Sequence, residues 1–203
     1  MKAIFYLSLL TGLLSFSCSK ESGITQGPVI KTPPSAETLK NYTIKLGNHY
    51  SDQSEVQLMN TPAIYAHVTF DSSAIYTTID PVNQADINKL IGFSDCGTHH
   101  QLNSARLGWS WNKKGLLLYA YAYVNSVRIS KILGAVPLNQ PLSCSVVASN
   151  NYYYFRAAHF IDSIPRHCKD FTGQNYKLFP YFGGDETAPH EIKITILEKT
   201  ILP

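Results

Sequence analysis

The sequence predicts an all-β protein: an antiparallel β-sandwich of the jelly-roll type with one short helix. About eight to ten short segments are rich in β-branched and aromatic residues, and several of them alternate apolar with polar side chains, as half-buried strands do. Gly, Pro, Asn and Asp separate these segments at short intervals. Charged residues make up only 15% of the chain, and its 13 tyrosines favour strands over helices. We therefore expect one sandwich domain over residues 40–203.

The N-terminus has the pattern of an export signal. Its first two residues supply a positive start, residues 3–16 are largely apolar, and a small residue precedes Cys18. This segment resembles the signal peptide and lipobox of bacterial lipoproteins of the Bacteroidota type, with Ser15 where leucine is usual. The resemblance implies that residues 1–17 are removed and that Cys18 is lipidated. The protein would then be exported and lipid-anchored to the outer membrane, on its periplasmic or cell-surface side. An ordinary cleaved secretory signal is the alternative.

Residues 18–39 are expected to form the lipidated cysteine and a flexible tether, because Ser, Gly and Pro are frequent there and apolar residues are few. No later apolar run approaches the ~18 residues that a membrane-spanning helix needs, so the lipid is the expected membrane contact. The net charge of +3 is spread along the chain without a basic stripe, which argues against nucleic acid as a partner.

Each expected element follows from a local pattern and its bounding turn residues. Strands are expected over residues 42–46, 63–70, 73–79, 104–111, 116–125, 127–133, 142–148, 152–160, 175–182 and 191–197. The helix is expected over residues 83–92, where Asn83 provides the N-cap, and Ile87, Leu90 and Ile91 share one face. The order of the hairpins resembles that of concanavalin-like lectin and glucanase sandwiches, a resemblance of architecture only.

The hairpin of residues 104–125 is the most informative stretch. A three-residue loop with Gly115 in the left-handed region fits the sequence Asn-Lys-Lys-Gly. The resulting register gathers five aromatic side chains on one face: Trp109, Trp111, Tyr119, Tyr121 and Tyr123. A shift of one residue would instead place Arg106 beside Tyr121. The aromatic face is expected either to stack on sugar rings, with Arg106 taking polar groups, or to form the core of the sandwich.

A polar loop precedes this hairpin and holds Asp95, Cys96, His99 and His100. Adjacent histidines on a strand would point to opposite faces, so the pattern favours a polar rim over a metal site. We expect no cofactor and no metal, with Asp185 and Glu186 in the later Gly-Gly turn as the weak candidates for a calcium site. Apart from Cys18, three cysteines remain, and the sequence leaves open three single pairings or three free thiols.

Two kinds of catalysis are compatible with the residues present. A jelly-roll polysaccharide lyase needs a cation to neutralise a uronate carboxylate and groups that move a proton, for which the candidates are His99, His100, Arg106 and Tyr121. A glycosidase needs two carboxylates ~5–9 Å apart, and the candidates are Asp95, Asp185, Glu186 and Glu191. The motifs E-x-D-x-x-E of concanavalin-like hydrolases, and R-x-E-x-R and Y-x-K-x-G of the lyases, are absent from the sequence.

The sequence therefore favours a cell-surface lipoprotein that binds a glycan or polysaccharide through an aromatic sheet face. The ligand-binding residues are expected to be Trp109, Trp111, Tyr119, Tyr121, Tyr123 and Arg106. One alternative is a polysaccharide lyase or glycoside hydrolase of the jelly-roll type. A second is a structural or protein-binding lipoprotein, which would expose an apolar patch or a sheet edge and have no groove.

Overall fold

The computed structural model describes residues 35–171 and 173–201, so the expected signal peptide, Cys18 and most of the tether lie outside the described residues. The elements are β1 (Ser35–Ile44), β2 (Ala63–Phe70), the 3-10 helices η1 (Ser72–Ala74) and η2 (Pro81–Ala85), β3 (Asn88–Ser94), β4 (Ser104–Trp111), β5 (Leu116–Val124), β6 (Val127–Val136), β7 (Leu142–Ala148), β8 (Tyr152–Ala157), β9 (Phe160–Pro165), β10 (Lys177–Leu178) and β11 (Ile192–Ile201). Because β1 begins at Ser35, the sandwich starts before the expected residue 40.

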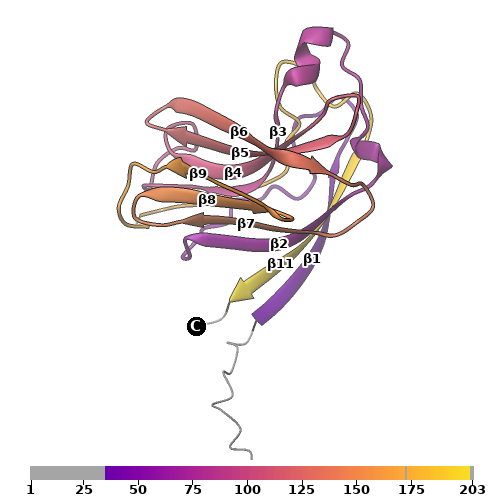
Figure 1. The fold of residues 1–203 in the computed structure, drawn as a ribbon. Helices are drawn as coiled ribbons and strands as arrows, with labels where there is room; N and C mark the ends of the chain where they lie inside the picture. The colour runs from indigo at the N-terminus through magenta and orange to yellow at the C-terminus, as the bar shows by residue number, and fades with distance from the viewer. Residues whose placement is uncertain (1–34, 172, 202–203) are drawn as a thin grey trace, which may run out of the picture. The chain divides into compact units, whose positions relative to one another are not determined.

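Two antiparallel sheets confirm the predicted β-sandwich. One sheet has six strands in the order β1-β11-β2-β7-β8-β9, and the other has five in the order β10-β3-β4-β5-β6. Figure 1 shows them as two layers, with β4, β5 and β6 over β7, β8 and β9, and with β11 beside β1. The predicted alternation in the last strand is also confirmed, since Ile192, Ile194 and Ile196 are all buried on one side of β11.

The core fills the space between the sheets, and Trp109 of β4 lies within it. Its side chain is 0% exposed, and its ring centroid lies 5.4 Å from that of Phe70 and 5.8 Å from that of Tyr76. Phe182, which follows β10, completes this aromatic cluster at 6.3 Å from Trp109. Large aromatic rings packed edge to face bury much apolar area, so this cluster joins the two sheets and the loops beside them.

The expected helix over residues 83–92 is wrong. A single turn of 3-10 helix occupies Pro81–Ala85, capped by Asp80, whose side chain accepts a hydrogen bond from the Val82 amide at 2.9 Å. Strand β3 then begins at Asn88, and its residues Leu90–Phe93 are buried. Burial on both faces explains the error, because a strand covered on both sides shows no alternation and its apolar run resembles one face of a helix.

Three other bounds differ from the expectation. Residues 73–79 form η1 and an irregular segment instead of a strand, the strand expected over 175–182 shrinks to β10, and the stretch 152–160 ends early so that β9 follows as a separate edge strand. Turn-forming or strand-breaking residues accompany the first two changes, among them Asp71, Ser72 and Pro180. The third change falls at Ala158, whose positive φ of 54° nothing in the local sequence predicts. Among the described residues, no helix combines the length and apolar character needed to cross a bilayer.

Candidate functional site

A recess of about 440 Å³ opens on the face of the five-stranded sheet that points away from the core. Strands β3, β4 and β5 supply its floor, and three loops supply its rim. The side chains around it are Tyr50, Lys89, His99, His100, Gln101, Arg106, Tyr121, Tyr123 and Tyr181, with Gly184 completing the lining. Side chains alternate between the two faces of a strand, so the residues of β4 and β5 that avoid the core point toward this recess.

The pairing of β4 with β5 decides which side chains reach the recess. Arg106 lies opposite Tyr121, and Trp109 opposite Leu118. The register expected from a three-residue loop is therefore wrong by one residue, and the shifted alternative holds. The turn consists of Lys113 and Lys114, with the positive φ of 68° at Lys113 instead of at Gly115.

The asparagine that opens the turn favours this geometry. The Asn112 side-chain oxygen accepts hydrogen bonds from the backbone amides of Lys114 at 3.0 Å and Gly115 at 2.9 Å. An asparagine side chain that bonds the backbone two and three residues ahead mimics a tight turn and thereby stabilises the shorter loop. The expected face of five aromatic side chains is therefore divided between the core and the recess.

The two tryptophans do not form a ligand platform, because they lie on the core side. Trp109 is enclosed by other aromatic rings, and Trp111 is partly buried against the core. Tyr119, Tyr121 and Tyr123 lie on the opposite face of β5, and only the last two line the recess. Tyr119 is 9% exposed, and its hydroxyl is paired with the Ser110 hydroxyl at 2.9 Å.

Arg106 is a buried cation without a carboxylate partner. Its side chain is 7% exposed, and among the described residues its Nε atom has no hydrogen-bond partner and no acidic group pairs with its guanidinium. The guanidinium lies 5.8 Å from the centroid of the Tyr121 ring, and burial lowers the pKa of Arg106 from its ordinary value. A buried charge with an unsatisfied donor is costly, and Arg106 is therefore the side chain of the recess that most needs an explanation.

Gly92 of β3 makes the position of Arg106 possible. It is paired directly with Arg106, and a Cβ atom at this glycine would lie 2.1 Å from the Ala105 carbonyl oxygen and 2.4 Å from the Arg106 Cα. Any side chain here would push β3 away from β4. The irregular register between Lys89 and Gly92 in β3 accompanies this close approach.

Lys89 adds a second cation to the floor. Its ammonium lies 5.3 Å from the ring centroid of Tyr121 and 5.9 Å from that of Tyr181, distances at which a cation is attracted to an aromatic face. Burial, followed by the charge of Arg106, lowers the pKa of Lys89 to about 8. Near neutral pH the floor therefore carries two positive charges held by tyrosine rings.

The rim carries the two histidines on residues 95–103, which we call the histidine loop. His100 is partly buried, and its backbone N–H donates to the Tyr176 hydroxyl at 3.0 Å while its Nδ1 lies 3.1 Å from the same oxygen. Burial and then the charge of Arg106 lower the pKa of His100 to about 4, so its imidazole is neutral near pH 7. His99 is exposed, and its ring lies 4.2 Å from that of His100.

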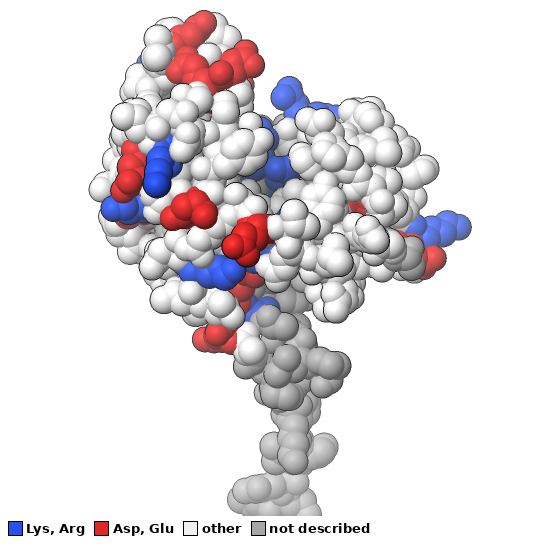
Figure 2. All heavy atoms as spheres, turned by 180° about the vertical axis from the view of Figure 1, so that it is seen from behind, with Lys and Arg blue, Asp and Glu red and all other residues white. Residues whose placement is uncertain are grey.

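No carboxylate lines the recess within the described part of the chain, and the four acidic candidates are held elsewhere. Asp95 is buried in an ion pair with Arg166, and Glu191 is paired with Lys193 at 3.1 Å. Asp185 is an exposed residue of the turn. In the space-filling view, acidic atoms gather on an outer knob and along the lower surface, whereas Lys and Arg atoms are visible in the hollow beside the knob (Figure 2).

Glu186, a candidate calcium ligand, instead binds the segment around η2. Its two carboxylate oxygens accept hydrogen bonds from the backbone amides of Ile79 and Asp80, each at 2.8 Å, and from the Asn83 side chain at 2.9 Å. These bonds lower the pKa of Glu186 from its ordinary value. A carboxylate that already accepts three hydrogen bonds in a loop has a structural task.

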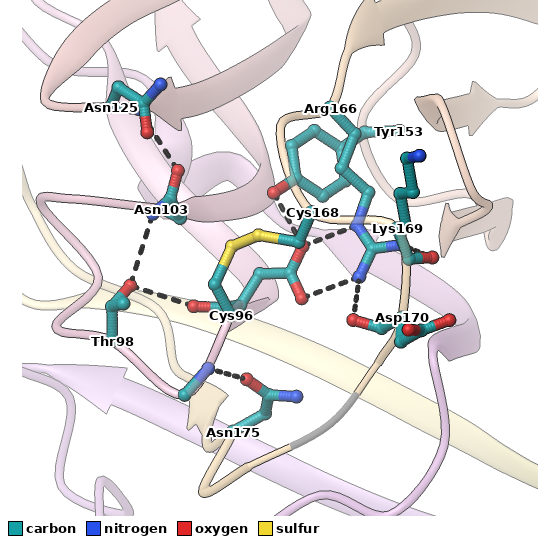
Figure 3. The surroundings of a disulfide bond; sticks show 12 residues. Cys96, Thr98, Asn103, Asn125, Tyr153, Arg166, Cys168, Lys169, Asp170 and Asn175 are labelled. Atoms are coloured by element: carbon teal, nitrogen blue, oxygen red, sulfur yellow. Dashed lines mark hydrogen bonds and ion pairs between the residues drawn. A yellow bond between two sulfur atoms is a disulfide. The ribbon is translucent and has the colours of Figure 1, made fainter.

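The cysteines resolve the alternatives that the sequence leaves open. Cys96 and Cys168 form a disulfide (Figure 3). Cys144 is free and buried, and burial raises the pKa of its thiol to about 12. The ligand atoms of Asp95, Cys96 and Cys168 lie within 4.8 Å of one another. They are unsuited to a metal because the two sulfurs bond each other and the carboxylate is hydrogen-bonded to Arg166 and Tyr153.

Sequence reasoning missed Lys89, Gln101, Tyr50 and Tyr181 as recess residues. Lys89 belongs to the segment that was expected to be helical, so the sequence did not predict its place on the sheet. Tyr50 and Tyr181 come from loops far apart in the chain, and they meet through an isolated bridge and through rings 5.0 Å apart. The Tyr-Phe-Gly-Gly sequence beside Tyr181 was the available signal, since Gly184 has a φ of 88° and lines the recess.

Comparison with known proteins supports the fold. Neither a protein-family model nor a curated protein matches this sequence. Among solved structures, the alginate lyase AlyC3 is similar with a TM-score of 0.54 and 12% identity, over 79% of this chain and 74% of that one. The alginate lyase vAL-1 from Chlorella virus has a TM-score of 0.48 and 11% identity, over 84% and 90%. The endo-β-1,3(4)-glucanase SCLam has a TM-score of 0.48 and 9% identity, over 72% and 60%.

Proposed function

We propose that this protein binds an acidic polysaccharide in the recess and cleaves it by β-elimination, as a polysaccharide lyase. The observation that carries the proposal is Arg106, a buried guanidinium with an unpartnered Nε at the floor of an open recess. An anionic sugar is the ligand that would supply the missing partner, because guanidinium groups bind carboxylates through two parallel hydrogen bonds. The fold shared with the alginate lyase AlyC3 is consistent with this reading.

Elimination first requires that the charge of the uronate carboxylate be neutralised, and the two cations on the floor suit this requirement. The proton next to a uronate carboxylate is weakly acidic, and its removal places negative charge on that carboxylate. Arg106 and Lys89 would neutralise this charge as it develops, which is the electrostatic assistance that a lyase needs. Both cations lie within 6 Å of the Tyr121 ring centroid, so a sugar carboxylate bound between them would be attracted by both.

His100 is the proposed base and a tyrosine the proposed acid. A neutral imidazole is the form able to accept a proton, and the lowered pKa of His100 keeps it neutral above pH 4. The proposal requires Nδ1 to donate to Tyr176, which leaves the lone pair of Nε2 for the substrate. Burial, followed by a hydrogen bond with Tyr123, raises the pKa of Tyr121 to about 12, so this phenol is protonated and able to donate.

The proposed elimination needs no reactant besides the polysaccharide and these side chains. His100 takes the proton from the carbon that bears the carboxylate, and the electron pair forms a double bond to the neighbouring ring carbon. The bond from that carbon to the glycosidic oxygen breaks, and Tyr121 or its neighbour Tyr123 returns a proton to the departing oxygen. The products are a new non-reducing end with a double bond conjugated to the carboxylate and a shortened sugar chain.

Hydrolysis fits the site less well. A glycosidase needs two carboxylates ~5–9 Å apart beside the sugar, and no acidic side chain lines the recess among the described residues. Binding without cleavage, the reading favoured by the sequence, uses the same cations and tyrosines. The two are separated by whether an unsaturated product forms.

The test is an assay on a panel of uronate polymers, which reads the ultraviolet absorbance of the conjugated double bond. We expect turnover on at least one polymer, and Arg106→Ala to lower kcat/KM by about 100-fold or more, the usual effect of removing a charge-stabilising donor. Arg156→Ala is the matched control, because this arginine lines a separate hollow of about 410 Å³ on the outer face of the six-stranded sheet. We expect it to leave turnover unchanged.

Each outcome decides one part of the proposal. Binding of a polymer without absorbance would overturn the lyase reaction and leave glycan binding. Turnover that survives Arg106→Ala but falls in Arg156→Ala would show that the active site lies on the six-stranded sheet and not in the recess. No binding and no turnover across the panel would refute an acidic polysaccharide as the ligand.

A further inference from the structure

The histidine loop is closed at its base by the sheet. It joins the end of β3 to the start of β4, and the Asp95 amide donates to the Asn103 carbonyl at 2.9 Å. Further hydrogen bonds cross the loop, including those from the Thr98 amide and hydroxyl to the Asp95 carbonyl at 3.0 and 2.8 Å. His99 and His100 follow Thr98 directly, and the His99 carbonyl accepts hydrogen bonds from the amides of Leu102 at 2.8 Å and Asn103 at 3.3 Å.

Asp95 anchors one side of the loop in the protein interior. Its carboxylate is 0% exposed and accepts hydrogen bonds from Arg166 Nε at 2.6 Å, from Arg166 Nη2 at 2.9 Å and from the Tyr153 hydroxyl at 2.7 Å (Figure 3). A buried charge pair is held in one geometry, because removing either partner would leave the other charge buried and unpaired.

Arg166 ties the same point to the segment that contains the second cysteine. Its remaining N–H groups donate to the carbonyl oxygens of Ser149 at 2.7 Å, Lys169 at 3.1 Å and Asp170 at 3.0 Å. Residues 166–170 therefore wrap around the guanidinium (Figure 3). Cys168 lies within this turn, and its Cα is 5.8 Å from that of Cys96, the residue after Asp95.

The backbone at Cys96 is held in an unfavourable conformation. Its φ is 61°, in the left-handed region that non-glycine residues rarely adopt, and Gly97 follows with a φ of 62°. Such a conformation is unfavourable for a residue with a side chain and persists only where the surroundings enforce it. The disulfide enforces it from the sulfur side, and the Gly97 amide, which donates to the Asn175 side chain at 2.9 Å, enforces it from the backbone side.

The other end of the loop reaches the recess. The His100 carbonyl accepts a hydrogen bond from the Ser104 hydroxyl at 2.6 Å, and its amide donates to the Tyr176 hydroxyl. Tyr176 follows Asn175 in the chain, so contacts from one segment hold the loop both at Gly97 and at His100. The strained turn at Cys96 sets the direction in which the loop leaves β3, and hence the side of the sheet on which His100 lies.

We propose that the Cys96–Cys168 disulfide, seated on the Asp95–Arg166 ion pair, is a positioning element that holds His100 in the recess. The proposal rests on the proposed function only in giving His100 a task there. The disulfide lies outside the apolar core, so opening it should release the histidine loop and leave the sandwich folded. In this reading Cys96, Cys168, Asp95 and Arg166 contact no ligand and act through the loop.

The primary test is the titration of the His100 imidazole, followed by NMR on isotope-labelled protein. In the wild type we expect it near pH 4, because the loop holds the ring in a buried position beside Arg106 and His99. In the Cys96→Ser/Cys168→Ser double variant we expect it to move by at least 1 pH unit toward the ordinary value of 6.5. His190, whose Nε2 lies 2.8 Å from the Ser73 carbonyl oxygen, is the internal control. Its resonances should be the same in the wild type and in the double variant.

Hydrogen exchange supplies a readout that requires no activity. The amides of Gly97 and His100 should exchange at least about tenfold faster in the double variant, while those of core strands such as β2 and β11 keep their protection. Cys144→Ser is the matched cysteine substitution, because Cys144 is a free thiol elsewhere in the fold. If the double variant does not fold, reduction of the folded wild type by dithiothreitol gives the same comparison.

Activity measurements distinguish this proposal from the proposed function. If the wild type cleaves a polyuronate, the double variant should lose at least about tenfold in kcat with little change in KM, because Arg106 and Lys89 still bind the substrate. If the wild type cleaves nothing, the lyase proposal fails while titration and exchange still decide the positioning role. An unchanged His100 titration together with unchanged exchange at Gly97 and His100 would overturn the positioning role.

Discussion

At the level of single residues, the floor of the recess is distinguished by its two cations. Arg106 and Lys89 are both largely buried, and neither forms an ion pair among the described residues. Elsewhere the same chain pairs its buried arginine completely, as Arg166 shows with Asp95. This contrast between Arg166 and Arg106 is the reason that the proposed function assigns an anionic ligand to Arg106.

The two perturbed pKa values predict how activity depends on pH. Below about pH 4 His100 becomes protonated and loses its ability to accept a proton, so kcat/KM should fall. Above about pH 8 Lys89 loses its charge and attracts a carboxylate less strongly, so kcat/KM should fall again. Replacing Lys89 by Arg should move the alkaline limb to higher pH, since arginine stays charged.

The control for this pH profile is Lys114→Arg, which changes an exposed lysine in the turn between β4 and β5. It should leave both limbs in place. An alkaline limb that stays near pH 8 in Lys89→Arg would show that another group controls it. The measurement is the initial rate of double-bond formation across the pH range, at substrate concentrations well below KM.

At the level of elements, the β4–β5 hairpin divides its aromatic side chains between two environments. A strand pair has two faces, and the register determines which residues share each face. Here Trp109 is placed between the sheets and the row of tyrosines from Tyr119 to Tyr123 on the outer face. The hairpin therefore supplies side chains both to the core and to the recess, through residues that alternate along the chain.

This division predicts opposite effects for two substitutions in one hairpin. Trp109→Ala should lower the free energy of unfolding by about 3–5 kcal/mol, because it leaves a large cavity in the core. Tyr123→Ala removes a partly buried side chain at the recess, so it should change stability by less than about 1 kcal/mol and weaken polysaccharide binding. Urea denaturation and a binding titration measure the two effects, and equal destabilisation by both would contradict the division.

At the level of the whole molecule, the sandwich supports the loops that form the rim of the recess. The floor of the recess comes from three neighbouring strands, whereas the rim comes from segments around Tyr50, His100 and Tyr181 that are distant in the sequence. The Cys96–Cys168 bond joins positions 72 residues apart, so it ties the histidine loop to a later part of the chain. A disulfide of this kind fits the export that the N-terminal sequence predicts.

We propose that Cys18, outside the described residues, is the lipid anchor of the mature protein. Cells expressing the wild type should incorporate labelled fatty acid into the protein, which should sediment with membranes, because several acyl chains hold a protein stably on a bilayer. Cys18→Ala should abolish the label and shift the protein to the soluble fraction. Cys144→Ala, which leaves the signal intact, is the control, and a Cys18→Ala protein that remains labelled would refute the anchor.

The sequence by itself determined the fold class and most strands, because alternation, β-branched residues and turn residues are local signals. It also singled out Arg106, His100 and Tyr121 as candidates. Only the tertiary structure decided which side of the hairpin each residue occupies, because a slip of one residue exchanges the two faces and the turn residues favoured the wrong register.

The same limit explains the other differences between expectation and structure. The partner of Cys96, the burial of Asp95 on Arg166 and the presence of Lys89 in the recess all depend on segments that meet from distant parts of the chain. Local propensity contains no information about such contacts. The strand at Leu90 was mistaken for a helix for a related reason. A strand that is covered on both faces has apolar residues on both, so its sequence lacks the alternation that identifies a strand.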